Sequence, residues 1–200
     1  DLHKAAAKRP CDTEYIVSRG EYINARILAC VMHCSFVDSV KFVRFSDKGI
    51  YDPRATAGLG KEHLAHRIGR CIIPGFYGAQ PDGSIKLFGR GGSDLTASIV
   101  ANVVDAGVHE NWTSASGLFV ADPKVVRNPR LIKVASYDET LELASTGAKI
   151  LPYEALIPVM QKRIPIHIRN TDRPQDSGSM IVHRDDVPHR KTGSVLGIAG

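Results

Sequence analysis

The segment best suited to chemistry is residues 89–94, which read Gly-Arg-Gly-Gly-Ser-Asp. It follows a predicted strand at 85–88 and leads into an apolar run with helical periodicity. Backbone amides at a helix N-terminus favour anions, and glycines let a ligand approach the backbone closely. Arg90 adds a planar guanidinium that matches a carboxylate or a phosphate. The alternative is a tight turn in which Ser93 or Asp94 caps the helix, and local spacing favours neither interpretation.

Other residues admit a chemical interpretation beside a structural one. Ser18 and Glu21 have the spacing of a helix capping box, and a ligand role for Glu21 depends on whether it faces a cleft. His63 and His66 would share one helix face, but no second half at the spacing of a structural zinc site follows. The four cysteines contain no CxxC pair. We therefore predict no protein metal site.

The hydrophobic periodicity predicts helices and strands that could position these residues. The sequence predicts helices over residues 21–33, 61–69, 95–107, 136–147 and 153–162. It predicts strands over residues 37–45, 71–73, 85–88, 108–112, 164–168 and 179–182. An irregular connection is expected over 46–60, a hairpin-like turn over 81–84, and a capping box at Ser136 and Glu139. Strands that alternate with helices indicate α/β layering.

The composition excludes several classes of protein. Apolar residues make up 43% and charged residues 24% of the 200, as in ordinary globular domains. No apolar run approaches the ~20 residues of a membrane span. The net charge is +5 and the pI about 9.1, but the basic residues are scattered, which does not favour nucleic-acid binding. We see no secretory leader and expect the cysteines to be reduced thiols.

Several spaced motifs together resemble those of aspartate kinases of the amino-acid kinase family, over about residues 15–182. The most specific is the family's G-R-G-G-S-D-x-T, which is found at 89–96. Further segments are similar to S-x-G-E at 18–21, G-F-x-G at 75–78, W-T-D-V-x-G at 112–117, A-D-P-R at 121–124, G-A-K at 147–149 and I-P-I…N-T…G-T between 164 and 179. Motifs that occur in the family's order are more specific than any one of them.

The resemblance implies a three-layer αβα sandwich around a mainly parallel sheet, the carbamate kinase-like fold. It implies transfer of the ATP γ-phosphate, with Mg²⁺, to the β-carboxylate of L-aspartate, the first step of lysine, threonine and methionine biosynthesis. It further implies a cytoplasmic, allosteric enzyme. Because the family's opening strand is not found in this sequence, a sheet edge would be left open, and we expect a homo-oligomer. The composition predicts neither a nucleic acid nor a membrane as a partner.

The resemblance also implies roles for individual residues. Arg90 would hold the α-carboxylate of aspartate, and Asp94 would orient groups at the transferring phosphate. Around the amino acid would lie Glu21, Phe76 and Ser93. The nucleotide site would be lined by Gly91, Gly92, Thr113, Phe119, Lys124 and Lys149.

The sequence departs from the family pattern in two ways. The K-F-G-G segment, which supplies the family's opening strand and a phosphate-stabilising lysine, is not among these 200 residues. Ser114, Phe119 and Lys124 replace a usual aspartate, tyrosine and arginine, which puts ATP affinity in question. We therefore expect no appreciable turnover from these 200 residues alone.

The expected organisation is a partial catalytic domain over 1–190, followed over 191–200 by a linker and the start of an ACT-type regulatory domain. Three alternatives stay open. The chain could belong to a related amino-acid kinase with another acidic substrate. It could be a degenerate member that binds nucleotide without turnover, or a fragment that folds only when a partner completes its sheet.

Overall fold

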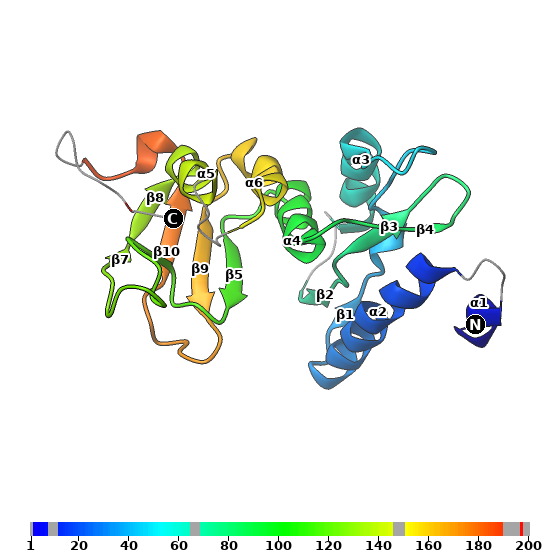
Figure 1. Ribbon diagram of the computed structural model, residues 1–200. Helices are drawn as coiled ribbons and strands as arrows, with labels where there is room; N and C mark the ends of the chain where they lie inside the picture. The colour runs from blue at the N-terminus through cyan, green and yellow to red at the C-terminus, as the bar shows by residue number, and fades with distance from the viewer. Residues whose placement is uncertain (1, 8–11, 65–68, 146–150, 190–196, 198–200) are drawn as a thin grey trace. The chain divides into compact units, whose positions relative to one another are not determined.

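A computed structural model describes residues 2–7, 12–64, 69–145, 151–189 and 197 (Figure 1). The chain divides into two compact units, unit 1 over Asp1–Val104 and unit 2 over Asp105–Gly200, and each is described by itself. Both units combine helices with strands, in agreement with the predicted α/β class. None of the described helices is both long and apolar enough to span a membrane.

Unit 1 is built from short strands between helices. Its helical segments are α1 (Leu2–Ala7), α2 (Thr13–Val31), the 3-10 turn η1 (Ser39–Lys41), α3 (Pro53–Leu64) and α4 (Gly92–Val103). Its strands are β1 (Ser35–Phe36), β2 (Cys71–Ile72), β3 (Tyr77–Ala79) and β4 (Ile85–Leu87). β1 and β2 pair in parallel, whereas β3 and β4 form the predicted hairpin. Within this unit, α2 lies on one side of the strands and α3 and α4 lie on the other (Figure 1).

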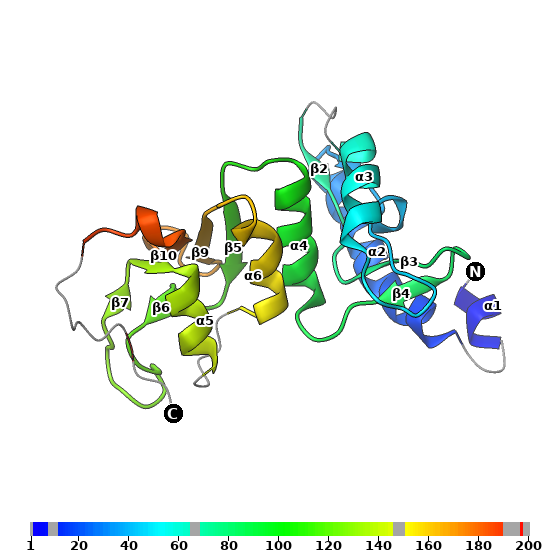
Figure 2. The same ribbon diagram turned by 90° about the horizontal axis from the view of Figure 1, so that it is seen from above.

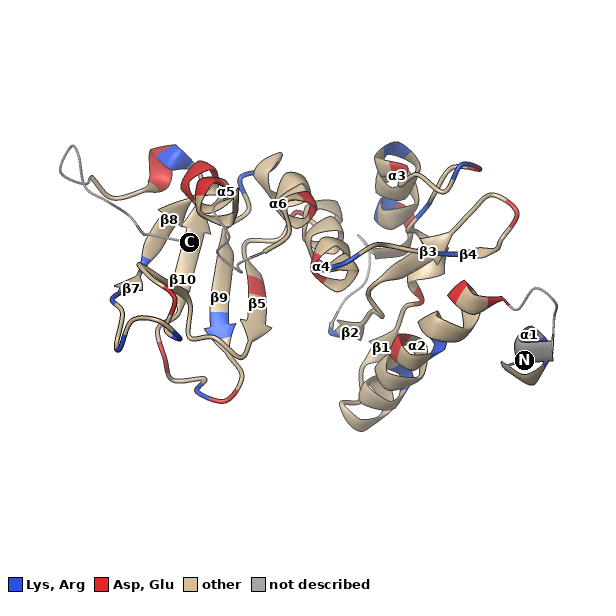
Figure 3. Ribbon diagram, in the orientation of Figure 1, with Lys and Arg blue, Asp and Glu red and all other residues tan. Residues whose placement is uncertain are grey.

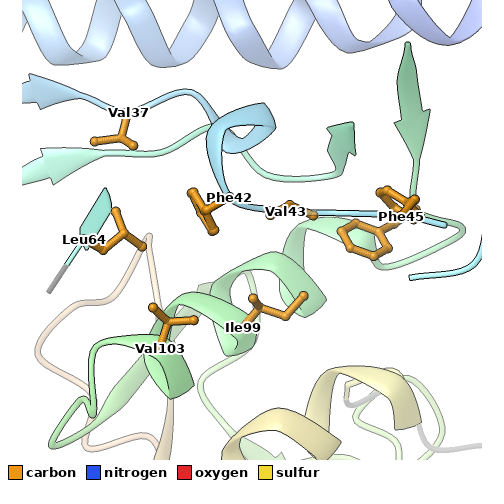
Figure 4. Packing of buried hydrophobic residues seen from close by; sticks show 8 residues of the cluster. Val37, Phe42, Val43, Phe45, Leu64, Ile99 and Val103 are labelled. Carbon is orange, nitrogen blue, oxygen red and sulfur yellow. The ribbon is translucent and has the colours of Figure 1, made fainter. Parts of the chain in front are cut away.

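The core of unit 1 fixes α4 and therefore the loop that begins it. Val37, Phe42 and Val43 are fully buried beside Ile99 and Val103 of α4. Figure 4 shows these side chains gathered between the segment around η1 and the apolar face of α4. Burial of one such side chain contributes about 1.5–3 kcal/mol, so the cluster holds α4 firmly in place.

The prediction that Ser18 and Glu21 form a capping box is wrong. α2 already begins at Thr13, because Asp12 is its N-cap and accepts a 3.1 Å hydrogen bond from the N–H of Tyr15. Ser18 is buried inside the helix, where its hydroxyl donates to the carbonyl oxygen of Tyr15 at 2.7 Å. Glu21 therefore lies in the middle of a helix and not at its start.

The predicted strand over 37–45 is also wrong. Asp38 accepts a 3.3 Å hydrogen bond from the N–H of Val40 and starts the 3-10 turn η1 at this point. Two isolated bridges follow, from Arg44 to Ala79 and from Phe45 to Tyr51. The apolar residues of this segment are buried by a turn and not by strand alternation.

The region 46–60, expected to be irregular, contains most of α3. Pro53 is the first helical residue, where the N–H that proline lacks has no intrahelical partner in any case. Gly60 lies within the helix, and a Cβ at this position would approach Cγ1 of Val103 to 2.7 Å. A glycine is therefore needed where α3 packs against α4. The proline and the glycine thus start the helix and allow close packing, and neither breaks it.

Helix α4 ends earlier than predicted. Its last residue is Val103, and the N–H of Val104 still donates to the carbonyl oxygen of Val100 at 3.0 Å. Asp105 then takes a left-handed φ of 51°. The predicted end of the helix at residue 107 is therefore wrong, and Gly107 is not among the glycines with positive φ.

Unit 2 contains a four-stranded sheet in the order β5-β9-β10-β8. Its strands are β5 (His109–Thr113), β6 (Leu118–Phe119), β7 (Leu131–Ile132), β8 (Val134–Ser136), β9 (Ile166–Asn170) and β10 (Ser179–Val182). β5 is parallel to β9 and β8 is parallel to β10, whereas β9 and β10 are antiparallel. β6 and β7 form a separate antiparallel pair.

Helices cover this sheet. α5 (Tyr137–Ser145) packs against β8, β10 and α6 (Tyr153–Met160), and a 3-10 turn, η2 (Arg184–Asp186), follows β10. Figure 2 shows α5 and α6 on the same side of the sheet. The unit therefore has a helical layer on a sheet that is mainly parallel. Fully buried side chains come from both layers, for example Ile166 of β9, Ile181 of β10 and Leu156 of α6.

The second predicted capping box is confirmed. The N–H of Ser136 donates to Oε2 of Glu139 at 2.7 Å, and the N–H of Glu139 donates to Oγ of Ser136 at 3.0 Å. Tyr137 follows, its hydroxyl bonded to the carbonyl oxygen of Ile164, and burial raises its pKa to about 12. The predicted end of this helix at Gly147 lies outside the described residues.

Candidate active site

The loop at residues 89–94 leads directly into α4. Gly91 is the N-cap and has a left-handed φ of 77°, a conformation that glycine adopts without the steric cost of a Cβ. The N–H of Gly92 donates to the carbonyl oxygen of Gly89 at 3.1 Å, and the N–H of Leu95 donates to that of Gly91 at 3.1 Å. The cap is therefore a glycine, and neither Ser93 nor Asp94 performs that function.

The segment Gly75–Phe76 packs against this loop. A Cβ on Gly92 would lie 2.5 Å from Cβ of Phe88 and 3.2 Å from Cδ2 of Phe76. A Cβ on Gly75 would lie 3.1 Å from Cα of Ser93. Two motifs that are separate in the sequence thus meet, and they bring together three predicted site residues, Phe76, Gly92 and Ser93.

Phe76 is held in an uncommon backbone conformation at this contact. Its φ is 83°, which non-glycine residues adopt rarely and at a cost of about 1–3 kcal/mol. Its N–H donates to Oγ1 of Thr96 at 3.0 Å, and its carbonyl oxygen accepts from the N–H of Phe88 at 2.8 Å. The Thr96 hydroxyl in turn donates to the carbonyl oxygen of Gly92 at 2.8 Å. Such strain often occurs at functional sites, where the surrounding structure maintains it.

The polar residues of the loop are open to solvent to different degrees. Arg90 and Ser93 are exposed, whereas Asp94, in the first turn of α4, is half-buried. The positive end of the α4 dipole and the Arg90 guanidinium both favour an anion here. Figure 3 shows that the basic and acidic residues of the described part of the chain are otherwise spread over the elements of each unit and form no continuous basic stripe there.

Glu21, in contrast, is not joined to this loop. It is exposed on α2, and its side chain makes no hydrogen bond or ion pair to another described residue. In the same motif, Arg19 is the residue whose side chain makes contacts. The Arg19 guanidinium lies 4.6 and 4.5 Å from the ring centroids of Tyr15 and Tyr22 and donates to Oγ of Ser18 at 3.0 Å. Sequence reasoning missed this cluster, although tyrosines four residues before and three after an arginine are a usable signal.

Unit 2 contains the residues expected at a nucleotide. Thr113 is the last residue of β5, and its carbonyl oxygen accepts from the N–H of Thr171 at 2.9 Å. Phe119 is half-buried in β6, and Lys124 is exposed in the loop that follows, where its N–H donates to Oδ1 of Asp122 at 2.8 Å. Lys149 lies outside the described residues. No bond in the described part of unit 2 joins Phe119 or Lys124 to Thr113.

A buried polar network at the carboxyl ends of β5 and β9 was missed by sequence reasoning. Asn170 is buried, and its Nδ2 donates to Oγ of Ser116 at 2.9 Å. Ser116 donates to Oδ2 of Asp176 at 2.6 Å and accepts from Arg173 at 3.0 Å. The sequence signal that could have indicated this network is the Asn-Thr pair at 170–171, which follows the alternating strand predicted over 164–168. The network fixes the loops that leave this edge of the sheet.

A second polar group lies on one face of the same sheet. The β5–β9 register places Trp112 opposite Arg169, whose guanidinium lies 4.4 Å from the Trp112 ring centroid and donates to Oε1 of Glu110 at 3.3 Å. Although desolvation opposes the change, hydrogen bonds from Arg169 and Trp112 lower the pKa of Glu110. These are cross-strand pairs that stabilise the sheet.

In the described part of the chain, no group of three or more His, Cys, Asp or Glu side chains is arranged to hold a metal ion. His63 lies at the end of α3, and His66 is outside the described residues.

The sequence model of the amino acid kinase family matches residues 3–170, most of the chain. The chain belongs to the amino acid kinase family. Among curated members, Aspartokinase 3 of Bacillus subtilis is 33% identical over 192 residues, which are 92% of this chain and 41% of that protein. The chain therefore spans less than half the length of this relative.

Solved structures of family members agree. The crystal structure of Clostridium acetobutylicum aspartate kinase superposes with a TM-score of 0.85 at 40% identity, over 93% of this chain and 42% of that one. That of E. coli aspartokinase III, in complex with aspartate and ADP, gives a TM-score of 0.80 at 29% identity, over 86% and 40%. The amino acid kinase fold predicted from the motifs is thereby confirmed.

Proposed function

We propose that the protein containing this chain is an aspartate kinase, which transfers the γ-phosphate of ATP to the β-carboxylate of L-aspartate. The observation that carries the proposal is the packing of Gly75–Phe76 against the glycine loop that opens α4, with Arg90 and Ser93 exposed beside it. Relatives of this chain are named aspartokinases, and one solved relative is described as a complex with aspartate and ADP.

The aspartate is assigned to unit 1. Arg90 pairs with its α-carboxylate through two parallel N–H···O bonds, a geometry that arginine provides and lysine does not. The Ser93 hydroxyl and the Phe76 ring lie beside the same loop and define where the amino acid sits. Glu21 binds the α-ammonium group in this proposal, because it is the carboxylate of the second motif and is exposed.

The nucleotide is assigned mainly to unit 2. Thr113 and Phe119 line the nucleoside, while Lys124 and Lys149 supply positive charge to the phosphates. Gly91 and Gly92 let the phosphate that is transferred approach the positive end of α4 closely, although the N–H of Gly92 already donates to the carbonyl oxygen of Gly89. Asp94, in the first turn of that helix, orients groups at this phosphate. Ser114 in place of an acidic residue, with Phe119 and Lys124, distinguishes this nucleotide site from the usual family pattern.

Mg²⁺ accompanies the nucleotide in this proposal. It prefers phosphate oxygens and water to an all-protein cage, and a glycine loop beside a single half-buried carboxylate is compatible with that preference. We therefore assign it no dedicated set of protein ligands.

The chemical demands on the protein are positioning and charge stabilisation. The attacking atom is a carboxylate oxygen of the substrate, so the protein needs no nucleophile of its own. Negative charge develops on the transferred phosphate in the transition state. Hydrogen-bond donors that are already fixed toward this charge stabilise it strongly, because they need not reorganise during the reaction. The strained, hydrogen-bonded loop pair around Phe76 is a rigid base for such donors.

The regulatory and cellular parts of the proposal rest on the relatives. The E. coli relative is named a lysine-sensitive aspartokinase, and we propose amino-acid feedback for this protein also. We further propose that residues 191–200 lead into an ACT-type regulatory domain, and that the protein is a cytoplasmic homo-oligomer.

The test is an ADP-release assay on the full-length gene product that carries this sequence, with Mg-ATP and a panel of acidic substrates. Aspartate-dependent turnover of roughly 1–100 per second supports the proposal. Turnover with another acidic substrate alone would assign a different amino-acid kinase. Nucleotide binding without turnover on any substrate would assign a degenerate member.

A further inference from the structure

We propose that the Thr96 hydroxyl is a positioning residue for aspartate, because it holds the two substrate loops in register. The inference rests on the proposed function and deepens it. Thr96 is buried in α4, with 2% of its surface exposed, so it acts on the substrate only through the loops that it joins.

The hydroxyl uses both of its hydrogen-bonding capacities between the loops. It accepts from the N–H of Phe76 at 3.0 Å, which ties it to the Gly75–Gly78 segment. It donates to the carbonyl oxygen of Gly92 at 2.8 Å, which ties it to the Gly89–Asp94 loop. One oxygen atom therefore connects the two segments, and its bond from Phe76 spans 20 residues of the sequence.

Only one of these bonds is ordinary. A threonine within a helix commonly donates to the carbonyl oxygen four residues earlier, and the bond to Gly92 is of that kind. The bond from Phe76 is different, because it comes from another loop and from a residue with a φ of 83°. If this acceptor is lost, Phe76 keeps only the hydrogen bond between its carbonyl oxygen and the N–H of Phe88, and its uncommon conformation is less stable.

The position of Phe76 determines the shape of the loop pair. The Phe76 ring and Cα lie 3.2 and 3.4 Å from where a Gly92 Cβ would be, and the preceding Gly75 lies against Ser93. If Phe76 relaxes to negative φ, its ring leaves Gly92 and the Gly75 backbone leaves Ser93. The groups that we assign to aspartate then lose their common geometry, whereas the nucleotide residues of unit 2 are unaffected.

The variants are Thr96→Val, Thr96→Ser and Thr56→Val in the full-length gene product. Valine matches the shape of threonine but lacks the oxygen, and serine retains the oxygen. Thr56 is the matched control, because it is also fully buried in unit 1 and its Oγ1 also accepts from a backbone N–H, that of Arg44 at 3.0 Å. It belongs to α3, and among the described residues it makes no hydrogen bond to either substrate loop.

We expect Thr96→Val to raise the aspartate KM roughly fivefold to a hundredfold, the range expected for one lost buried hydrogen bond, while the ATP KM changes less than about threefold. Thr96→Ser is expected to stay within about threefold of wild type for both substrates. Thr56→Val is expected to lower the unfolding temperature without changing the aspartate KM.

A second readout does not depend on activity. Amide hydrogen exchange of the peptide that contains Phe76 is expected to become faster in Thr96→Val than in wild type or in Thr96→Ser. An unchanged aspartate KM in Thr96→Val, an equal rise in both KM values, or a Thr96→Ser variant as impaired as the valine variant would overturn the inference. If the wild-type protein has no aspartate kinase activity, the proposed function fails, and the exchange experiment still decides whether Thr96 holds Phe76.

Discussion

The substitution Gly92→Ala tests the packing of the candidate site, because two physical effects there have opposite signs. Gly92 is the first residue of α4, and at a helical position alanine is more favourable than glycine by about 0.8–1 kcal/mol. The new Cβ, however, would lie 2.5 Å from Cβ of Phe88, whereas carbon atoms prefer separations of about 3.5–4.0 Å. Helix propensity alone predicts a more stable protein, and packing predicts a less stable one.

The geometry determines which effect is larger. The atom in the way is the Cβ of a buried phenylalanine, which is fixed to its backbone and cannot rotate aside, and Phe76 closes the other side at 3.2 Å. Overpacking of this kind costs about 1–3 kcal/mol, and we place a clash with two fixed groups in the upper part of that range. After the gain in propensity is subtracted, Gly92→Ala is expected to destabilise unit 1 by about 1–2 kcal/mol.

The assay is thermal unfolding of the full-length gene product, with Gly89→Ala as the control. A Cβ on Gly89 meets nothing within 4 Å, so this neighbouring variant should match wild type to within about 0.5 kcal/mol. Gly92→Ala is expected to lower the unfolding temperature by about 2–8 °C. A Gly92→Ala protein that is as stable as wild type, or more stable, would refute the close packing of Gly92 between Phe88 and Phe76.

Three further predictions concern binding, capping and pH. Arg90→Ala and Arg90→Lys are each expected to raise the aspartate KM about tenfold to a hundredfold with little change in the ATP KM. Lysine does not restore binding because it lacks the two parallel donors of the guanidinium. Steady-state kinetics that show an unchanged aspartate KM would remove Arg90 from the site. Ser136→Ala is expected to lower the free energy of unfolding by about 1 kcal/mol in urea denaturation. A smaller loss is expected for Glu139→Gln, because glutamine retains an acceptor oxygen. Equal stability of the wild type and both variants would contradict the capping box. Burial raises the pKa of Tyr51 and of Tyr137 from 10.0 to about 12, so the stability that they contribute is complete below pH 10 and is lost as the pH rises toward 12. In an ultraviolet titration, ionisation of every tyrosine near pH 10 while the protein is still folded would contradict this burial.

The sequence predicted the substrate loops better than the elements around them. The motifs at 75–78 and 89–96 identified residues that do meet, because glycine patterns at such sites reflect close approaches of the backbone. The bond from Phe76 to Thr96 was not predicted, since it depends on how two loops pack. Glu21 lies on a helix that starts earlier than expected and has no bond to the loop, so its role at the same site stays a prediction.

Local signals failed where tertiary packing or an unexpected cap decided the structure. Ser136 and Glu139 cap a helix, whereas Ser18 and Glu21 have the same spacing and do not, because Asp12 caps that helix upstream. An irregular connection was expected over 46–60, but Gly60 lies within α3, where a Cβ would clash with Val103 of α4. Spacing alone cannot distinguish these cases, since the deciding partner lies elsewhere in the chain.

The most direct test of the central claim is detection of the product. An acyl phosphate formed on the β-carboxylate of aspartate reacts with hydroxylamine to give the β-hydroxamate, which can be identified by mass spectrometry. The full-length gene product is expected to form aspartyl β-hydroxamate only when aspartate and Mg-ATP are both present, and Arg90→Ala is expected to form far less at limiting aspartate. ADP release without the hydroxamate, or no hydroxamate from a folded protein that binds both substrates, would contradict the claim.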